Sequence, residues 1–575
     1  MMSPLARRTV VAAFLAAFVA LSVWEMRDQS GTYDEGPHLS AAYSALVLGD
    51  YRMVTEQPPL GRRIAAMALL GEDVHLPTGR PAWREAEHFG FGFAFLFQSG
   101  NRTDRILFRA RLAMLGWGLL LLLSVYAVAR ELFGDAGGLL ALAAGALNPN
   151  LLAHAHLVTV DVAAAALAFL AVVAFQRWLD APTPWRSAAA GILAGGAVMA
   201  KLSMLVLGPV FAMLGIAHAV RFARERPPFA AAEPGARGGA VRWAAGLLVM
   251  AALVYATIWG AYGFRFATSP DLTYQATQHL QYGPQGMRGI LAWIAAHRLL
   301  PEALLVGLTE LRNHAVAGHW GFALGQYSRE GWWWYLPFTF LVKNPVSWLA
   351  LLVVGVITWA RRRDTRAGWG PAFGLAALGI TAFAMASPLA MGIRHLLPAF
   401  PFAMVACGAA WPEAATGRVL AARVAVGALA IGLAVECLAG SPYHLAYFNA
   451  PTVAAAPRHR VLLDSNLDWG QDLTRLSRWL DERGIRDVKL AYFGMASPRH
   501  AGIRHEILLP TFSQYTRMEK EWRVAQGIGA GDTVAVSAFL LDKLEATDAL
   551  PPRSRLLAVI GHSIFVFQVT APEGT

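Results

Sequence analysis

The stretch GTYDEGPHLSAAYSALVLGDYRMVTEQPPLG, residues 31–61, follows the first apolar run of the chain and decides how we interpret the rest. It opens with the acidic pair Asp34 and Glu35 and ends in a Pro-Pro turn, Glu56-Gln57-Pro58-Pro59-Leu60. An ionised carboxylate inside hydrocarbon is costly, so acidic residues beside membrane spans are expected to face water or a partner. This stretch therefore predicts a carboxylate site at the bilayer surface.

The composition indicates a polytopic α-helical membrane protein. The 575 residues are 56% hydrophobic and only 15% charged, and the apolar residues form long runs. The net charge of +11 comes from Lys and Arg in short segments between those runs, which is where the positive-inside rule expects them, so we predict no nucleic-acid partner. Cys407 and Cys437 both fall within apolar runs, so the sequence supports no disulfide framework.

About eleven transmembrane helices are predicted. The apolar runs lie near residues 9–24, 107–129, 138–152, 158–179, 187–200, 202–220, 243–262, 336–360, 369–387, 395–411 and 420–440. Runs 138–152 and 187–200 are short, so one pair could be re-entrant. Run 9–24 is also short and could instead be a signal-peptide core.

The distribution of basic residues orients these spans. An odd number of crossings places the two termini on opposite sides of the membrane. The loops that then lie inside are all basic, among them those with Arg130, Arg177, Arg186, Arg221, Arg224, Arg361 and Arg423. We therefore expect a multi-pass protein of the cytoplasmic (inner) membrane with a cytoplasmic N-terminus and an extracytoplasmic C-terminal domain.

Two long loops and most polar side chains fall on the outer side. In loop 25–104, Leu39 to Leu48 is predicted to form a short amphipathic helix lying at the interface. Loop 263–335 is too long for a simple connection and ends in Gly331-Trp332-Trp333-Trp334-Tyr335. That aromatic cluster is typical of an interfacial belt, and a sugar-stacking platform is the alternative.

Residues 450–575 are expected to form a small soluble α/β domain, which follows a membrane domain of residues 1–449. Val461–Leu463 predicts a strand, Leu473–Arg483 an amphipathic helix and Val488–Phe493 a second strand. Further strands are expected in 533–538 and 556–569. The segment Asp464–Asp472 lies at a predicted strand-to-helix turn, where it serves either as a ligand site or as a capping sequence.

Carboxylates and cations at one membrane surface suit the transfer of a group from a phosphate leaving group to a hydroxyl. The carboxylate accepts the proton of the hydroxyl, and the cations neutralise the departing phosphate. The candidate phosphate ligands are Arg62, Lys201, Lys343, Arg394 and His395. Each cation taken singly could instead be a snorkelling anchor at a helix end. Asp161 could equally be an N-terminal dipole partner of its helix.

Six motifs occur in an order that resembles a known family. They are Tyr33-Asp34-Glu35, Glu56-Gln57-Pro58-Pro59-Leu60-Gly61, Val158-Thr159-Val160-Asp161, Ala200-Lys201-Leu202-Ser203, Gly331-Trp332-Trp333-Trp334-Tyr335 with Leu341-Val342-Lys343-Asn344-Pro345, and Gly392-Ile393-Arg394-His395-Leu396-Leu397-Pro398. Together they resemble the bacterial protein-mannosyltransferase-like glycosyltransferases of family 39, which have the GT-C fold and are similar to the aminoarabinose transferases of lipid A.

The resemblance implies an inverting membrane glycosyltransferase that uses a polyprenyl-phosphate monosaccharide at the outer face of the membrane. It implies that Asp34 is the catalytic Asp, with Glu35 beside it and Asp161 as a second Asp. It places Pro58 and Pro59 in a substrate loop with Glu56 and Gln57, and assigns Arg394 and His395 to the Arg-containing motif. No metal or other cofactor is implied, because the donor carries its own activated phosphate.

The chain departs from the family pattern at two positions. Relatives commonly have His or Lys where Gln57 stands and Lys where Arg62 stands. Gln57 carries no charge and so cannot bind phosphate as a cation, whereas Arg62 can replace Lys as a cation but with a different geometry. The C-terminal domain also lacks resemblance to the sugar-binding domain of eukaryotic relatives, which leaves the acceptor open among protein, lipid and glycan.

The sequence thus predicts a membrane glycosyltransferase in which Asp34 is the general base or orients the acceptor, with Asp161 and Glu35 in support. A polytopic transporter or flippase of a lipid-linked substrate is the alternative, although no internal repeat is visible and the polar groups collect at one face. An inactive homologue that only binds the polyprenyl lipid is a third possibility. The expected partners are a polyprenyl-phosphate sugar, an acceptor and membrane lipids.

Overall fold

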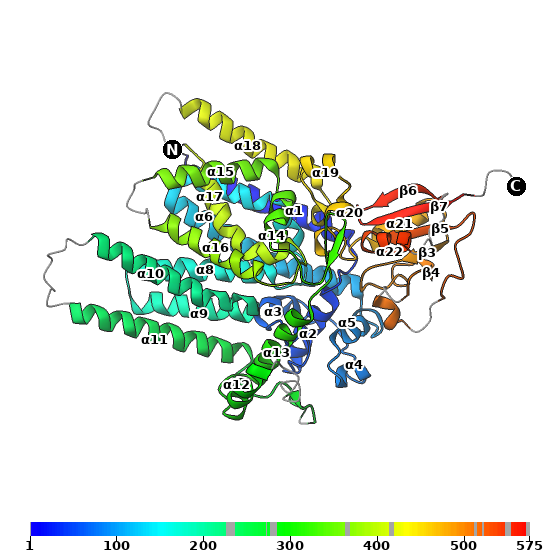
Figure 1. Ribbon diagram of the computed structural model, residues 1–575, viewed down its shortest axis with the longest axis horizontal. Coiled ribbons are helices and arrows are strands. Elements are labelled where there is room, and N and C mark those ends of the chain that lie inside the picture. Colours follow the sequence, from blue (N-terminus) through cyan, green and yellow to red (C-terminus); the bar gives the residue numbers. More distant parts are fainter. Residues whose placement is uncertain are drawn as a thin grey trace.

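The computed structural model describes residues 2–225, 236–271, 273–276, 285–362, 368–412, 419–510, 514–519, 523–546 and 554–570. These residues form a long helical body with a small β-sheet at one end (Figure 1). The N-terminus lies at the opposite end of the helical body from that sheet. The helical body therefore separates the start of the chain from its C-terminal part.

The helical body contains the following long helices: α1 (Pro4–Arg27), α6 (Thr103–Ala146), α8 (Asp161–Asp180), α9 (Pro184–Ala200), α10 (Leu207–Glu225), α11 (Ala236–Ala261), α14 (Tyr335–Lys343), α15 (Val346–Arg361), α16 (Trp369–Met385), α17 (Phe400–Gly408) and α18 (Val419–Gly440). Short helices complete it: α7 (Pro149–Ala155), η1 (Leu202–Val206) and η3 (Ile393–Ala399). Helix α9 packs between α8 and α11, and α17 packs against α6 and α15.

The helices confirm a multi-pass membrane protein, and each of the eleven predicted apolar runs is helical. Six described helices are long and apolar enough to cross a membrane, or seven if the bent pair α14 and α15 is one span. The remaining runs form shorter apolar helices or parts of longer ones, so the predicted number of about eleven full spans is not reached by length and composition in the described residues. Runs 107–129 and 138–152 form one helix kinked at Gly134, whose φ of 75° only glycine adopts readily.

Basic residues predicted to lie inside meet at the end of the body that carries the N-terminus. Asp135, just after the Gly134 kink, pairs with Arg7 at 3.1 Å and with Arg130 at 2.6 Å. Arg177 at the end of α8 pairs with Glu131 at 2.7 Å. Loops far apart in the sequence therefore share one end of the helical body, which agrees with the predicted order of the spans.

The two long loops form helical layers between the body and the sheet. The first contains α2 (Glu35–Val47), α3 (Leu60–Met67), α4 (Pro81–Arg84) and α5 (His88–Phe97), and the second α12 (Gln285–Ala296) and α13 (Glu302–Ala317). The prediction that Leu39–Leu48 is an interfacial amphipathic helix is wrong in part. The helix exists as α2, but its residues are buried from Glu35 to Ala45, because α3 and α5 pack against it.

The C-terminal part contains a five-stranded mixed sheet. Its strands are β3 (Asp487–Ala491), β4 (Arg504–Ile507), β5 (Thr533–Ser537), β6 (Ser554–Ile560) and β7 (Ile564–Val569), in the order β4-β3-β5-β7-β6. Strand β3 is parallel to β4 and β5, whereas β7 is antiparallel to β5 and β6. Helices α21 (Leu473–Glu482) and α22 (Ala538–Ala546) accompany the sheet. The predicted helix and three predicted strand regions are confirmed, and β4 was missed.

The strand predicted at Val461–Leu463 is wrong. Val461 ends helix α20 (Arg458–Val461), and Leu462 makes only an isolated bridge to Ala323. The three apolar residues are buried because they pack on the helical body and on a short hairpin, β1 (Gly321–Ala323) and β2 (Gln326–Ser328). Other short helices connect the body to the sheet: η4 (His444–Ala446), α19 (Ala450–Ala455) and η5 (Asp464–Asn466), whereas η6 (Gln514–Arg517) lies between β4 and β5. A domain boundary at residue 450 remains a prediction.

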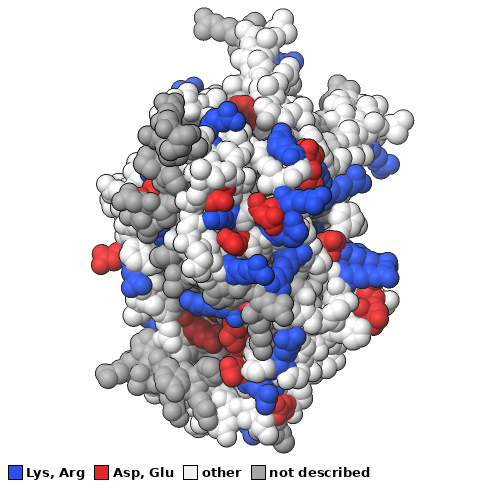
Figure 2. All heavy atoms as spheres, turned by 90° about the vertical axis from the view of Figure 1, so that its right-hand side faces the viewer, with Lys and Arg blue, Asp and Glu red and all other residues white. Residues whose placement is uncertain are grey.

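The end of the molecule that carries the sheet is polar. Figure 2 views this end and shows Lys and Arg side chains interspersed with Asp and Glu over it. The exposed faces of α15 and α18 instead carry large apolar side chains such as Val353, Ile431 and Val435. The polar end suits water, and the apolar helix faces suit hydrocarbon.

Gly355 tests how closely the spans pack. A side chain at this position of α15 would run into the backbone carbonyl of Ala406 on α17. We expect Gly355→Ala to destabilise the protein by about 1–3 kcal/mol through overpacking, which would appear as a lower Tm of the purified protein. Gly374→Ala on α16 is the matched control, because no atom lies within 4 Å of its added Cβ. Equal Tm values for the two variants would contradict the close packing of α15 on α17.

Candidate functional site

The first pair of predicted site residues meets at the polar end of the helical body. The carboxylate of Asp34, immediately before α2, accepts a hydrogen bond from Arg394 Nη1 at 2.8 Å. These side chains are 22% and 14% exposed, so the pair is reachable from outside. The guanidinium of Arg394 also lies over the ring of Trp469, 4.5 Å from its centroid. A carboxylate and a cation separated by 360 residues are thus joined at one accessible point.

A second predicted pair lies close to the first. Asp161 begins α8, and its carboxylate accepts a hydrogen bond from Lys201 Nζ at 2.6 Å at the end of α9. Arg394 interacts electrostatically with both Asp34 and Asp161, and His395 with Lys201, Arg394 and Asp161. The structure therefore brings five predicted site residues together, although their roles in catalysis and phosphate binding remain predictions.

Glu35 has a different environment from Asp34 and needs a correction as a catalytic residue. Its side chain is fully buried and binds Arg111 of α6 with both oxygens, at 2.8 Å and 2.5 Å. It also accepts hydrogen bonds from the backbone of Thr32 and Val158. Burial alone would raise the pKa of Glu35, but Arg111 and these backbone donors hold it below its usual range. Glu35 cannot reach a substrate from this position, and it fixes the start of α2 instead.

The prediction that Lys343 binds phosphate also needs a correction, because backbone carbonyls of the protein already accept hydrogen bonds from its ammonium group. Nζ donates to the carbonyl oxygens of Leu445 at 2.8 Å and Asn466 at 2.6 Å, and it lies 4.6 Å from the ring centroid of Phe448. The Lys343 side chain is buried, and its ammonium group points toward the residues that connect the helical body to the C-terminal part. Its apolar sequence context correctly predicted a partnered charge, but the partners are carbonyls and not a phosphate site.

The predicted substrate loop forms a turn that leads into α3. Pro58 and Pro59 are buried, whereas Glu56 and Gln57 are partly exposed. Arg62 donates from Nη2 to the carbonyls of Met53 and Val54 at 3.4 Å and 3.1 Å. Its Nε and Nη1 have no hydrogen-bond partner among the described residues, although the side chain is buried.

Unused donors on a buried cation indicate room for an anion. Burial lowers the pKa of Arg62 only to about 10, and nearby Glu56 opposes the shift, so the guanidinium stays charged at neutral pH. Arg394 Nε and His395 Nε2 are likewise buried without a partner in the described chain. A buried polar group that lacks a partner is costly, and a bound ligand would remove that cost.

Sequence analysis missed His38. It lies one helical turn after Asp34, on the same face of α2, and its backbone N–H donates to the Asp34 carbonyl at 3.0 Å. Burial, and then the charge of Arg62, lowers the pKa of His38 to about 3, so the imidazole is neutral. Its Nδ1 has no partner among the described residues. The spacing of four from Asp34 was the signal that could have identified it.

Glu310 of α13 was also missed, because it lies far from the acidic pair in the sequence. Its carboxylate accepts a hydrogen bond from the hydroxyl of Thr55 and interacts with the carboxyl of Glu56. Gly307, one turn earlier, lies so close to the Thr55 carbonyl that any side chain there would collide with it. Helix α13 is thus held against the turn that contains the predicted substrate loop.

The comparisons with known proteins bear on this geometry. Residues 93–232 match the family model described as dolichyl-phosphate-mannose-protein mannosyltransferase. The family resemblance is confirmed over this segment. The match supports a glycosyltransferase of the kind that takes its sugar from a lipid-phosphate donor.

Other comparisons are weaker. No curated protein sequence matches the chain. The crystal structure of ArnT from Cupriavidus metallidurans bound to undecaprenyl phosphate is 15% identical, with a TM-score of 0.46 over 98% of this chain and 99% of that one. The apo structure of the same ArnT is 13% identical, with a TM-score of 0.32 over 99% and 100% of the two chains. Both scores lie below the level at which a shared fold is inferred.

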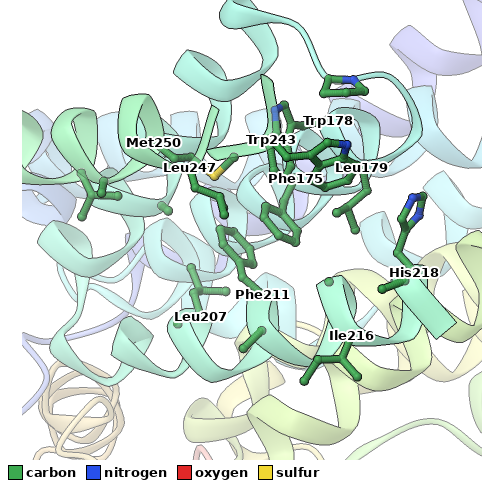
Figure 3. A pocket seen from close by; sticks show the side chains of 18 of the residues that line it. Phe175, Trp178, Leu179, Leu207, Phe211, Ile216, His218, Trp243, Leu247 and Met250 are labelled. Carbon is green, nitrogen blue, oxygen red and sulfur yellow. The ribbon is translucent and has the colours of Figure 1, made fainter. Parts of the chain in front are cut away.

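A large apolar groove lies among the helices that carry Asp161 and Lys201. Its volume is about 1060 Å³, and it lies between α8, α9, α10 and α11. Phe175 and Phe211 stack in it with ring centroids 4.1 Å apart, next to Trp178 and Trp243 (Figure 3). Val198 and Met204, on either side of Lys201 in the chain, line one end. Among the described lining residues only Asp180 and His218 carry ionisable side chains, so the groove suits a hydrocarbon chain.

The Glu56–Glu310 contact should make the docking of α13 depend on pH. Burial and the neighbouring Glu56 raise the pKa of Glu310 from 4.5 to about 7. The stability that protonated Glu310 contributes is therefore fully present below about 4.5 and is lost as the pH rises through about 7. We expect hydrogen exchange in Glu302–Ala317 to increase over that range beyond the intrinsic effect of pH, and Glu310→Gln to abolish this increase. Glu330→Gln, an exposed position of the same loop, is the control, and an unchanged profile in Glu310→Gln would contradict the assignment.

Proposed function

We propose that the protein transfers a monosaccharide from a polyprenyl-phosphate donor to an acceptor hydroxyl, with inversion and with Asp34 as general base. One observation carries this proposal. The accessible Asp34–Arg394 pair lies close to Asp161, Lys201 and His395, which come from separate helix ends. Such a set supplies both the base and the cations that the reaction needs.

The proposed reaction balances with the residues at hand. The acceptor oxygen forms a bond to the anomeric carbon while the bond from that carbon to the donor phosphate breaks. Asp34 takes the proton of the acceptor hydroxyl, and polyprenyl phosphate leaves as the anion. Because the donor phosphate is the activated leaving group, the reaction requires no cofactor.

Three cations are proposed to receive the phosphate. Arg394 and Lys201 each donate to one carboxylate, and Arg62 has two nitrogens, Nε and Nη1, without a hydrogen-bond partner among the described residues. A charged phosphate can share Arg394 and Lys201 with Asp34 and Asp161, since each cation has several donors. Glu35 is proposed to hold Asp34 in place, and Lys343 is not part of the proposed phosphate site.

The polar end is proposed to face the outside of the cytoplasmic membrane. The donor lipid would then reach the cations sideways from the outer leaflet, with its isoprenoid chain in the groove between α8, α9, α10 and α11. Val198 and Met204, three residues to either side of Lys201, line that groove, which supports binding of phosphate and chain at the same time.

The role of Asp34 is tested by sugar transfer. In membranes supplied with a labelled polyprenyl-phosphate hexose, we expect Asp34→Asn to abolish transfer at equal expression, because the amide cannot accept the proton. Asp73→Asn, in the same loop and highly exposed, should leave transfer unchanged. Transfer by Asp34→Asn at the wild-type rate would exclude Asp34 as the base. Lipid movement by a wild type that transfers no sugar would favour a flippase.

The groove is tested by filling it. Gly208 lines the groove, and an added Cβ there meets no atom within 4 Å, so Gly208→Leu fills space without collision. We expect the KM for a long-chain donor to rise roughly tenfold, equal to about 1.4 kcal/mol, whereas a donor with a short isoprenoid chain should be unaffected. Gly374→Leu on α16, also free of neighbours within 4 Å, is the matched control. The same KM change for both chain lengths would place the chain elsewhere.

A further inference from the structure

The segment Asp464–Asp472, here called the connecting segment, lies against the start of the first outer loop. The backbone N–H groups of Ser30 and Tyr33 donate to the carbonyls of Gln471 and Trp469, both at 3.0 Å. The hydroxyl of Ser30 donates to the Gly470 carbonyl at 2.8 Å. The connecting segment therefore holds the backbone immediately before Asp34.

The same segment also holds the other member of the Asp34–Arg394 pair. The backbone N–H of Ile393 donates to Asn466 Oδ1 at 3.0 Å, and the hydroxyl of Ser465 donates to the Met391 carbonyl. Between these contacts Gly392 has a φ of 140°, and a Cβ on it would lie 2.5 Å from Ser465 Oγ. Both sides of the candidate site are thus built on residues that precede the C-terminal sheet.

Asp464 forms a second acidic position beside that pair. It is a non-glycine residue in the left-handed region, with a φ of 58°. Its carboxylate lies 3.4 Å from Nε2 of His319, which is 36% exposed. Asp464 also interacts electrostatically with Arg394 and Tyr33. A carboxylate in a strained backbone position, paired with a histidine, therefore borders the Asp34–Arg394 pair.

The β1–β2 hairpin brings His319 to this position. Leu324, in the turn of the hairpin, donates its backbone N–H to the Val461 carbonyl at 3.0 Å, and Ala323 bridges to Leu462. In Figure 1 the green hairpin lies beside α20, just before the connecting segment. His319 lies two residues before the hairpin, so these contacts explain how an outer-loop side chain reaches Asp464.

Aromatic residues flank the His319–Asp464 pair: Trp320 follows His319 in the chain, and Tyr335 interacts electrostatically with Asp464. Trp320 is 51% exposed and lies under the guanidinium of Arg329, 4.9 Å from its centroid. Asn466 donates to the hydroxyl of Tyr335 at 2.9 Å, and the ring of Tyr335 lies near that of Trp332, with centroids 6.2 Å apart. The segment around Trp332 contacts the hairpin at Gly321. Part of the aromatic cluster is therefore tied to the connecting segment and cannot act solely as a membrane belt.

We propose that His319, Asp464 and the adjoining rings of Trp320 and Trp332 form the acceptor subsite, and that the acceptor is a carbohydrate. With Nε2–H donated to Asp464, His319 presents Nδ1 as an acceptor for one sugar hydroxyl. Asp464 Oδ1 already accepts the backbone N–H of Ser465, and the remaining lone pairs of the carboxylate accept a second hydroxyl. The apolar face of a sugar ring packs on an indole, a combination of contacts that a single Ser or Thr side chain does not offer. This inference rests on the proposed function, because it names the acceptor of that reaction.

The first experiment measures carbohydrate binding without any donor. Saturation-transfer difference NMR of the full-length protein in lipid nanodiscs would use methyl α-mannoside, maltose and chitobiose as probes, together with a Ser- and Thr-containing peptide. We expect signals for at least one saccharide, and a loss of at least about tenfold in affinity in Asp464→Asn and in His319→Ala. Asn tolerates the left-handed backbone at position 464, so the first variant keeps the fold.

The matched control is a second Asp–His pair on the same end of the protein. His500 lies 3.5 Å from Asp104 and is 39% exposed, slightly more than His319. His500→Ala should leave the saccharide signals unchanged. Absence of any saccharide signal in the wild type would overturn the proposal, and so would a peptide signal that depends on Asp464, which would make the acceptor a protein.

Transfer kinetics separate this inference from the proposed function. With the membrane fraction that becomes labelled in the transfer assay as acceptor, Asp464→Asn should raise the KM for that fraction at least about tenfold. The KM for the polyprenyl-phosphate donor should stay within about twofold of the wild type. A raised KM for the donor instead would assign Asp464 to the donor side. A wild type that binds saccharide but transfers nothing would refute the proposed transfer and leave the carbohydrate subsite standing.

Discussion

The buried ion pair between Glu35 and Arg111 is the constraint on which the candidate site depends. Two charges removed from water are tolerated only when their remaining hydrogen-bonding capacity is satisfied. Here Arg111 reaches both Glu35 oxygens and the carbonyls of Gln29 and Ser30, while Glu35 also takes the N–H groups of Thr32 and Val158. The pair thereby locks the end of α1, the start of α2 and the entry to α8 to one another. Asp34 occupies its accessible position because its neighbour is fixed in this way.

The candidate site combines charged side chains that are paired with an opposite charge and one cation, Arg62, that keeps unused hydrogen-bond donors. Asp34 with Arg394 and Asp161 with Lys201 are neutral pairs, which explains how four ionised groups can gather at helix ends near hydrocarbon. Arg62 departs from this pattern, since its only partners among the described residues are backbone carbonyls. Arg62 thus keeps unused donors near two neutral pairs, and Val198 and Met204, three residues to either side of Lys201, line the apolar groove.

Much of this arrangement could be predicted from the sequence. Long apolar runs determine helices in a membrane because every backbone polar group must be bonded within the segment, and all eleven predicted runs are helical. The position of charges at the ends of those runs correctly selected Asp34, Asp161, Lys201 and Arg394 as neighbours. What the sequence lacked was information on burial within the outer loops. Leu39–Leu48 has the pattern of a surface helix, but α3 and α5 cover it.

Contacts between segments far apart in the sequence account for the other differences between the predictions and the structure. The carbonyls around Lys343 come from Leu445 and Asn466, about a hundred residues away, so a local sequence pattern could not identify them. The apolar triplet 461–463 is buried by a hairpin from another loop, which a strand prediction does not anticipate. His38, in contrast, was accessible to prediction, because its spacing from Asp34 places both on one face of α2.

The contacts of the connecting segment have a consequence for how the chain could have been assembled in evolution. Domains that are exchanged between proteins usually join their hosts through linkers that few contacts cross. Here the residues that enter the C-terminal sheet bond to the first outer loop, to the Arg394 turn and to Lys343. A chimaera that joins this body to the sheet of a distant relative would therefore have to carry residues 464–472 with the body.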